Sequence, residues 1–291
     1  MSGQFFLGVD GGATQCRARV RSRDGARLAE SQGAAANIYV DFDKALASVA
    51  AVVAAALDKA GLKGREGAVA LGVGLAGLSS PHDARQVEAR FQNFARVAAA
   101  NDAVVACLGA HGGADGGIVI AGTGTAAMAR VNGAETVIGG RGFILGDDGS
   151  GARIGHEALR AAVRAADGIG PESAMTAAML QKFGGDPLAA VTWAAGAKPG
   201  DFGALAPLVL DHARREDALA LPIVMSAVAA IGALARAVKA LGAPRVALVG
   251  GLGGALRPFF PSELQAALGE PQADATEGAL LLAGLPRRAL A

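Results

Sequence analysis

Two glycine-rich turns, each set between apolar strand-like segments, constrain the fold of this chain more than any other feature. The first, residues 10–14, reads Asp-Gly-Gly-Ala-Thr, and the second, residues 122–125, reads Gly-Thr-Gly-Thr. Because glycine has no Cβ, backbone N–H groups in such turns can close around phosphate oxygens. Two such turns predict a nucleotide held from both sides by a duplicated fold, which favours a phosphotransferase.

The order of the predicted elements repeats along the chain. The first half predicts three strands within residues 5–31, a helix over 41–60, a strand over 68–75, a helix after Pro81, a strand over 96–100 and a helix to residue 111. The second half predicts strands at 118–121, at 125–131 and from 137, several helices between 150 and 242, a strand at 246–249 and a helix at 277–283. This pattern indicates an α/β architecture with internal duplication and a cleft between two lobes.

Composition and charge exclude several classes of protein. Hydrophobic residues make up 52% of the 291 residues, so the chain can bury a large core. The net charge of +1 gives no basic field for nucleic acid or an anionic membrane. The apolar stretch at 219–241 contains Pro222, Arg236 and Lys239, which predicts a buried helix and no membrane span. With no signal-peptide pattern at the start, we expect a cytoplasmic protein.

Few residues have the spacing of metal or redox ligands. Cys16 and Cys107 lie far apart and fit no cluster pattern, so we expect two buried thiols. Within residues 16–21, apolar residues alternate with Arg17, Arg19 and Arg21, which predicts a half-exposed strand.

Two aspartates are candidates for chemistry. Asp10 follows the first strand, where ligands bind in α/β sheets, and could hold Mg²⁺ directly or through water. The alternative is an ordinary Asp-Gly hairpin turn. Asp102 stands between a strand and a helix, where a carboxylate could accept the proton of an alcohol during phosphoryl transfer. The alternative there is a helix cap formed by Asn101 and Asp102.

Two further glycine-rich segments suit small-molecule contacts. Residues 139–150 combine glycines with Asp147 and Asp148, a composition suited to sugar hydroxyls, although helix capping is an alternative. Residues 250–254 read Gly-Gly-Leu-Gly-Gly, which would let backbone approach an adenine ring, or would simply form a flexible turn.

Taken together, these segments resemble those of one known family. Residues 10–14, 101–103, 122–125, 146–150 and 250–251 occur in the order seen in the BadF/BadG/BcrA/BcrD-type ATPase family, over nearly the whole chain. Residues 106–111, 139–141, 201–203 and 274–280 resemble its glucosamine kinase and N-acetylglucosamine kinase branch. The resemblance implies a duplicated ribonuclease-H-like, actin-like ATPase fold with a central nucleotide cleft. It implies an N-terminal lobe, residues 1–113, with the sugar and phosphate side and the catalytic aspartate. It also implies a nucleotide lobe, residues 114–291, whose last helix, 276–285, could return to the first lobe.

The same resemblance implies roles for individual residues. Asp102 would be the base for the sugar 6-hydroxyl and would contact the sugar. ATP and Mg²⁺ would be held by Asp10, Gly11, Gly12, Thr14, Gly122, Thr123, Gly124, Thr125, Gly250 and Gly251, with Asp10 at the metal. The remaining sugar-binding positions would be Asn37, Gly140, Arg141 and Asp147.

Two positions depart from the family pattern. Ala13 stands where the family usually has glycine, and a positive φ would be unfavourable for alanine. Thr125 stands where serine is usual and keeps the hydroxyl. We therefore expect activity to be retained.

The resemblance implies ATP-dependent phosphorylation of glucosamine to glucosamine 6-phosphate by a homodimer. N-acetylglucosamine kinase is the nearest alternative. An ATPase activator of an electron-transfer enzyme is a further one, which the scarcity of cysteine disfavours. A sugar-responsive regulator is disfavoured by the neutral charge.

Overall fold

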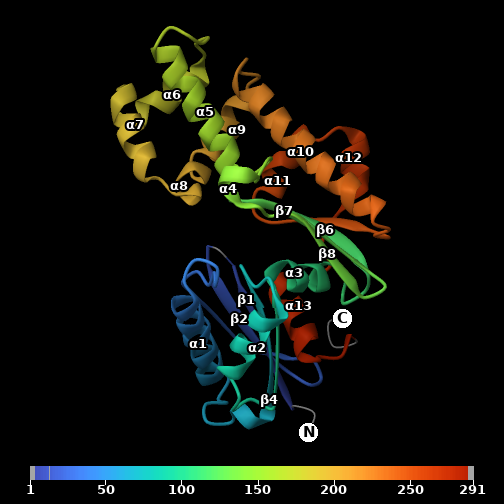
Figure 1. Ribbon diagram of the computed structural model, residues 1–291. Helices are drawn as coiled ribbons and strands as arrows, with labels where there is room; N and C mark the ends of the chain where they lie inside the picture. The colour runs from blue at the N-terminus through green and yellow to red at the C-terminus, as the bar shows by residue number, and fades with distance from the viewer. Residues whose placement is uncertain (1–3, 13, 288–291) are drawn as a thin grey trace. The chain divides into compact units, whose positions relative to one another are not determined.

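The computed structural model describes residues 4–12 and 14–287, which form two compact units (Figure 1). The N-terminal unit contains the chain up to Ile118, residues Met128–Glu135 and the chain from Glu270 onward. The second unit contains Val119–Ala127 and Thr136–Gly269. The first and the last of the described residues therefore both belong to the N-terminal unit. The predicted functional division between residues 113 and 114 stays a prediction.

The N-terminal unit is built on a mixed five-stranded sheet. Its strands are β1 (Phe5–Gly11), β2 (Cys16–Ser22), β3 (Arg27–Gly33), β4 (Val69–Leu75) and β5 (Arg96–Asn101), in the order β3-β2-β1-β4-β5. β2 runs antiparallel to β1 and β3, whereas β1, β4 and β5 are parallel. The carboxyl ends of β1, β4 and β5 therefore meet at one edge, where the predicted residues of this unit cluster.

Helices cover both faces of this sheet. They are α1 (Phe42–Lys59), the 3₁₀ turn η1 (Glu66–Ala68), α2 (Pro81–Ala89), α3 (Asp102–Ala110) and α13 (Ala275–Ala283). Side chains alternate across β1: Leu7 and Val9 lie in the core under α1, while Phe6 packs with Leu280 of α13. Residues of even number in β1, including Asp10, thus lie on the face shared by α3 and α13.

Close helix–sheet contact on that face requires glycine. A Cβ at Gly72 would lie 2.0 Å from the carbonyl oxygen of Ala279, and one at Gly8 would lie 2.5 Å from that of Thr276. The backbone of α13 therefore packs directly onto β1 and β4.

The second sheet repeats the order of the first. Its strands are β6 (Gly116–Ala121), β7 (Thr125–Val131), β8 (Ala134–Gly139), β9 (Val246–Val249) and β10 (Leu268–Gly269), in the order β10-β9-β6-β7-β8. Counted from its own first strand, each sheet reads 3-2-1-4-5. The predicted duplicated α/β fold is thereby confirmed. β8 begins earlier than the predicted start at Val137, because Asn132 and Gly133 turn the chain with positive φ angles.

The other helices within the described residues follow β8 in the sequence. They are α4 (Gly142–Leu145), α5 (Gly151–Ala166), α6 (Ala174–Gln181), α7 (Pro187–Gly196), α8 (Pro199–Gly203), α9 (Ala206–Arg214), α10 (Ala220–Ala240), α11 (Gly253–Leu256), η2 (Arg257–Phe259) and α12 (Ser262–Ala267). Among the residues described, α10 is the one helix long and apolar enough to cross a membrane. The helix packs against α9 and α5, and its buried residues include Val224, Ile231 and Val238. Because 39% of its most apolar stretch is buried, one face of α10 packs into the unit, and the prediction of a buried helix is confirmed only in part.

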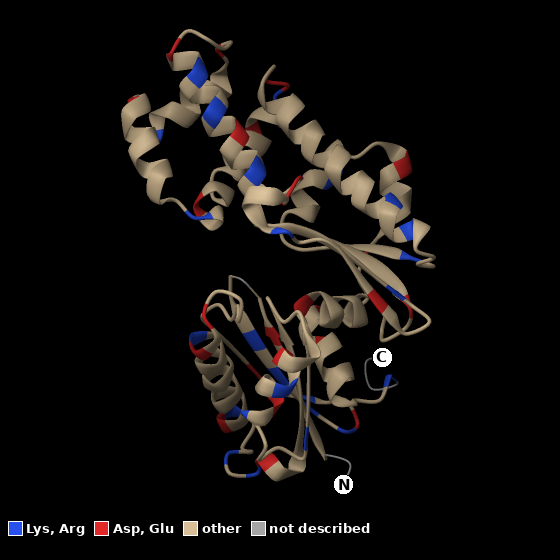
Figure 2. Cartoon of the chain, in the orientation of Figure 1, with Lys and Arg blue, Asp and Glu red and all other residues tan. Residues whose placement is uncertain are grey.

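Charged residues of both signs are interspersed over the elements of each unit (Figure 2). This distribution agrees with the net charge of +1.

Candidate functional site

The first glycine turn joins β1 to β2 in the N-terminal unit. The N–H of Gly12 donates to the carbonyl oxygen of Gln15 at 3.0 Å, and the carbonyl oxygen of Gly12 accepts from the N–H of Ala36 at 3.0 Å. Thr14 is exposed. The prediction about the φ angle of Ala13 lies outside the described residues. The turn is thus fixed at both Gly12 groups, with the Thr14 side chain open to solvent.

Asp10 ends β1 on the face of α3 and α13. Its side chain is 13% exposed, and its Oδ2 lies 3.3 Å from a guanidinium nitrogen of Arg17, the residue paired with it across the hairpin. Burial raises the pKa of Asp10, Arg17 opposes this rise, and the charge of Asp274 adds to it. A carboxylate with one cationic neighbour in a partly dry position would gain from a further cation.

Asn101 and Asp102 lie at the start of α3, where Asn101 caps the helix and Asp102 is the first helical residue. Asn101 is the N-cap of α3: its Oδ1 accepts from the N–H of Ala103, and its Nδ2 donates to the carbonyl oxygen of Leu78, both at 2.9 Å. Asp102 also accepts from Ala103 at 2.9 Å. Loss of solvation raises the pKa of Asp102 to about 6, and the negative charge of Asp10 contributes. Such a carboxylate can exchange a proton near neutral pH.

Asn37 lies beside the same edge of the first sheet. It forms an isolated parallel bridge with Ala76, the residue after β4. Its Oδ1 accepts from the N–H of Tyr39 at 3.0 Å, which fixes the side chain. Among the described residues, none accepts a hydrogen bond from its Nδ2. The N-terminal unit therefore brings Asp10 and Asp102 near each other and places Asn37 at the same edge of the sheet.

The second glycine turn joins β6 to β7 in the second unit and is bonded to the start of α5. The N–H of Gly151 donates to Gly122 O at 2.9 Å, and that of Ala152 donates to Thr123 O at 3.2 Å. The hydroxyl of Thr125 donates to Asp148 O at 2.9 Å, so the departure from serine keeps a bonded hydroxyl. These bonds hold the turn in one conformation.

The predicted sugar-binding residues of the second unit adjoin this turn. The N–H of Gly140 donates to Thr125 O at 3.1 Å, and Arg141, the next residue, is exposed. Asp147 has a φ of 60°, and its Oδ1 accepts from the N–H of Thr125 at 3.1 Å.

Gly250 reaches the same turn from β9. It has a φ of 98°, and a Cβ there would lie 2.4 Å from the carbonyl oxygen of Ala121, the last residue of β6. Gly251 has open space around its Cβ position. The second unit thus brings Gly140, Asp147 and Gly250 next to the Gly122–Thr125 segment and its flanking strand ends, and their roles in binding stay predictions.

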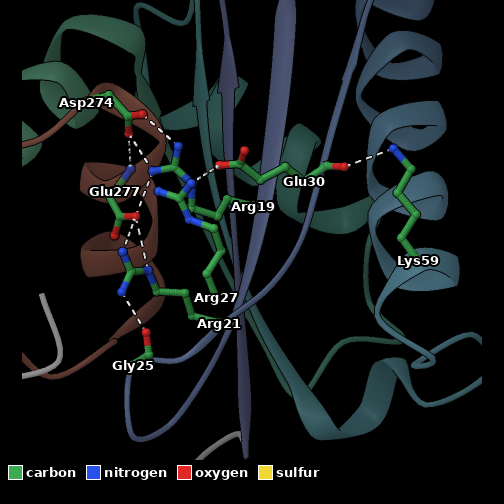
Figure 3. A network of polar contacts seen from close by, with 8 residues as sticks. All are labelled: Arg19, Arg21, Gly25, Arg27, Glu30, Lys59, Asp274 and Glu277. Carbon is green, nitrogen blue, oxygen red and sulfur yellow. Dashed lines mark hydrogen bonds and ion pairs between the residues drawn. The ribbon is translucent and has the colours of Figure 1, made fainter.

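One prediction about the N-terminal unit is wrong in part. Arg19 belongs to the alternating segment that predicted a half-exposed strand, yet it is only 8% exposed. Its guanidinium bonds to Asp274 at 2.8 and 2.9 Å and to Glu277 at 2.6 Å, and Glu277 also accepts from Arg21 (Figure 3). The network also includes Glu30, which pairs with Arg19 and accepts from Lys59 through its carbonyl oxygen. The carboxylates of Glu30, Asp274 and Glu277 compensate the buried charge of Arg19.

Sequence reasoning also missed Arg17 as a neighbour of Asp10. The signal was present, because residues directly opposite each other in a hairpin have side chains on the same face. Only the register of β1 against β2 was needed to find it.

Comparison with known proteins identifies the family to which the chain belongs. Residues 7–283 match the model of the BadF/BadG/BcrA/BcrD ATPase family. The chain belongs to this family. The BadF/BadG/BcrA/BcrD resemblance expected from the sequence is therefore confirmed, and family membership implies the use of ATP.

The chain is also similar to individual proteins in sequence and in fold. The chain is 33% identical over 287 residues to glucosamine kinase GspK of Vibrio cholerae, covering 98% of each chain. A crystal structure of a Chromobacterium violaceum protein named as a candidate N-acetylglucosamine kinase is 38% identical, with a TM-score of 0.90 over 97% of this chain and 100% of that one. A glucokinase of the ROK family from Streptomyces griseus, solved with glucose and AMPPNP, is 18% identical, with a TM-score of 0.56 over 97% of this chain and 98% of that chain. The chain thus has the actin-like ATPase fold of sugar kinases.

Proposed function

We propose that the protein transfers the γ-phosphoryl group of ATP to the 6-hydroxyl of glucosamine, giving glucosamine 6-phosphate. The carrying observation is Asp102, a partly desolvated carboxylate with a pKa of about 6 at the start of α3. In the proposed reaction this carboxylate accepts the hydroxyl proton, the sugar oxygen attacks phosphorus, and ADP leaves. The 98% overlap with a glucosamine kinase supports this choice of substrate class.

The other residues take roles that fit their positions. Gly11, Gly12 and Thr14 would contact phosphate from the first turn, and residues 122–125 would do so from the second. Gly250 and Gly251 would border the adenosine, since the backbone there carries no bulky side chain. Asn37, Gly140, Arg141 and Asp147 would contact the sugar.

A magnesium ion would be held by Asp10 together with substrate phosphates and water, and not by protein side chains alone. Among residues 4–12 and 14–287, no three His, Cys, Asp or Glu side chains form a group that could hold a metal ion. Mg²⁺ usually needs only one or two carboxylates, together with substrate phosphates and water. Asp10, directly or through water, would hold the ion, which would neutralise phosphate charge.

N-acetylglucosamine is the second candidate substrate. It is favoured by the 38% identity to a protein named for that activity. The two sugars differ at the 2-position, where one carries a cationic amine and the other a neutral acetamide. Comparing kcat/KM for the two sugars decides between them.

An activator ATPase with an iron–sulfur cluster is less well supported. An iron–sulfur cluster is held by several cysteine thiolates placed around it. Cys16 and Cys107 are both buried and belong to different elements, β2 and α3.

The test is an ADP-release assay over glucosamine, N-acetylglucosamine, glucose and no sugar. We expect the highest kcat/KM with glucosamine and little release without sugar. Equal ADP release with and without sugars would contradict a sugar kinase. We also propose a cytoplasmic homodimer, and light scattering of the purified protein would test its oligomeric state.

A further inference from the structure

We propose that Asp147 is a positioning residue that holds the second glycine turn in its nucleotide-binding conformation, besides any contact with the sugar. The inference rests on the proposed function, because it assumes that residues 122–125 bind the phosphates of the nucleotide.

The contact between Asp147 and the turn is direct. Its Oδ1 accepts from the N–H of Thr125 at 3.1 Å, and the carboxylate packs against Gly124. A Cβ at Gly124 would lie 3.0 Å from Oδ1 and 3.2 Å from Oδ2. The carboxylate thus occupies the space beside the turn and fixes the direction of one of its N–H groups.

The backbone of Asp147 is shaped for this contact. Its φ of 60° lies in the left-handed region, which few residues other than glycine, asparagine and aspartate adopt. Its carbonyl oxygen accepts from the N–H of Ser150, the N-cap of α5, at 3.0 Å. Arg153 of the same helix holds Gly146 O at 2.9 Å. The carboxylate is therefore aimed by a fixed loop.

Its neighbour Asp148 supplies a matched comparison. Asp148 contacts the turn through its carbonyl oxygen, which accepts from the hydroxyl of Thr125, while its side chain is 78% exposed. The Asp148 carboxylate lies 3.8 Å from Arg153, and its loss leaves the contacts of the turn in place. Removing the Asp147 carboxylate takes away one of those contacts.

The experiment measures MgADP binding by calorimetry without sugar. D147G suits the left-handed backbone but removes the acceptor, so we expect binding about 10-fold weaker or more. D147N keeps an oxygen acceptor and should stay within about 3-fold of wild type, as should D148N. Amide exchange at Thr125 should accelerate in D147G while the thermal midpoint changes little. Wild-type MgADP affinity in D147G would overturn the inference.

A second variant guards against misfolding of D147G. The methyl group of G124A would require the carboxylate to shift by a few tenths of an ångström, which should weaken MgADP binding by itself. In the double variant G124A/D147G the methyl group has room, so the two losses should be clearly less than multiplicative. Fully multiplicative losses, or MgADP affinity in G124A equal to wild type, would contradict the inference.

A wild-type protein that binds MgADP but phosphorylates no amino sugar would refute the proposed function alone. A wild-type protein that binds no MgADP would refute both.

Discussion

At the scale of single residues, the proposed chemistry depends on Asp102. Replacing it with asparagine keeps the size of the side chain and an acceptor for the N–H of Ala103, but removes the proton acceptor. We expect kcat to fall about 10²–10⁴-fold, the usual contribution of a general base. ADP release at saturating sugar measures it, with Asp148→Asn as the control. A kcat close to wild type in the Asp102 variant would refute the assignment.

The same carboxylate predicts a pH dependence. Asp102 must be ionised to accept a proton, and its pKa is raised to about 6 by desolvation and by the charge of Asp10. We expect kcat/KM to be half-maximal near pH 6 and to fall at lower pH, where Asp102 is protonated. Carboxyl ¹³C NMR should show the pKa of Asp102 moving down in D10N, because a raising charge is lost. An unchanged pKa would contradict the proximity of the two aspartates.

At the scale of elements, the ion-pair network of Figure 3 joins α13 to β2. Glu277 is 4% exposed and accepts from both Arg19 and Arg21. Replacing Glu277 with alanine removes a buried carboxylate partner of both guanidinium groups, while Arg19 keeps Asp274 and Glu30, so we expect a loss of about 1–3 kcal/mol. Urea unfolding should show this loss, while Glu263→Ala on the exposed surface of α12 should change stability by less than about 0.5 kcal/mol. Equal stability of both variants would mean that the network adds little.

Helix contact in the same unit depends on Gly278. A Cβ there would lie 1.7 Å from the carbonyl oxygen of Val105, so α13 and α3 touch through their backbones. Gly278→Ala should destabilise the N-terminal unit by about 1–3 kcal/mol, despite the better helix propensity of alanine. Gly254→Ala in α11, where a Cβ meets open space, is the matched control and should be neutral or mildly stabilising. Hydrogen exchange of α3 amides would separate the two cases, and equal exchange would argue against backbone contact.

At the scale of the whole molecule, local sequence signals predicted the architecture, whereas contacts between distant parts of the chain were not predicted. The helix predicted over 41–60 is present and is capped by Asp41, because capping depends on neighbouring residues alone. Arg19 was misjudged because two of its partners, Asp274 and Glu277, lie 255 and 258 positions further along the chain. The hydrogen bond from the N–H of Thr125 to Asp147 was not predicted, because it depends on how two loops pack. The short strand β10 was missed because two residues carry no periodicity.

The N-terminal unit also needs the end of the chain. Phe6 and Ala70 of the first sheet pack with Leu280, Ala283 and Leu285 of the C-terminal segment. A chain ending at residue 269 would expose this face, so we expect it to aggregate or to lose the protection of β1 and β4 amides in hydrogen exchange.

Moving the segment tests whether contact or chain order matters. The Cβ position of Gly284 lies 4.0 Å from the ring of Phe6, so the end of α13 is close to the start of β1. A permuted chain with residues 270–287 placed before residue 4, joined by a flexible linker, should regain the protection of β1 and β4 that the truncated chain loses. Full protection in the truncated chain would show that α13 is dispensable. Failure of the permuted chain to recover would show that the fold requires the original chain order.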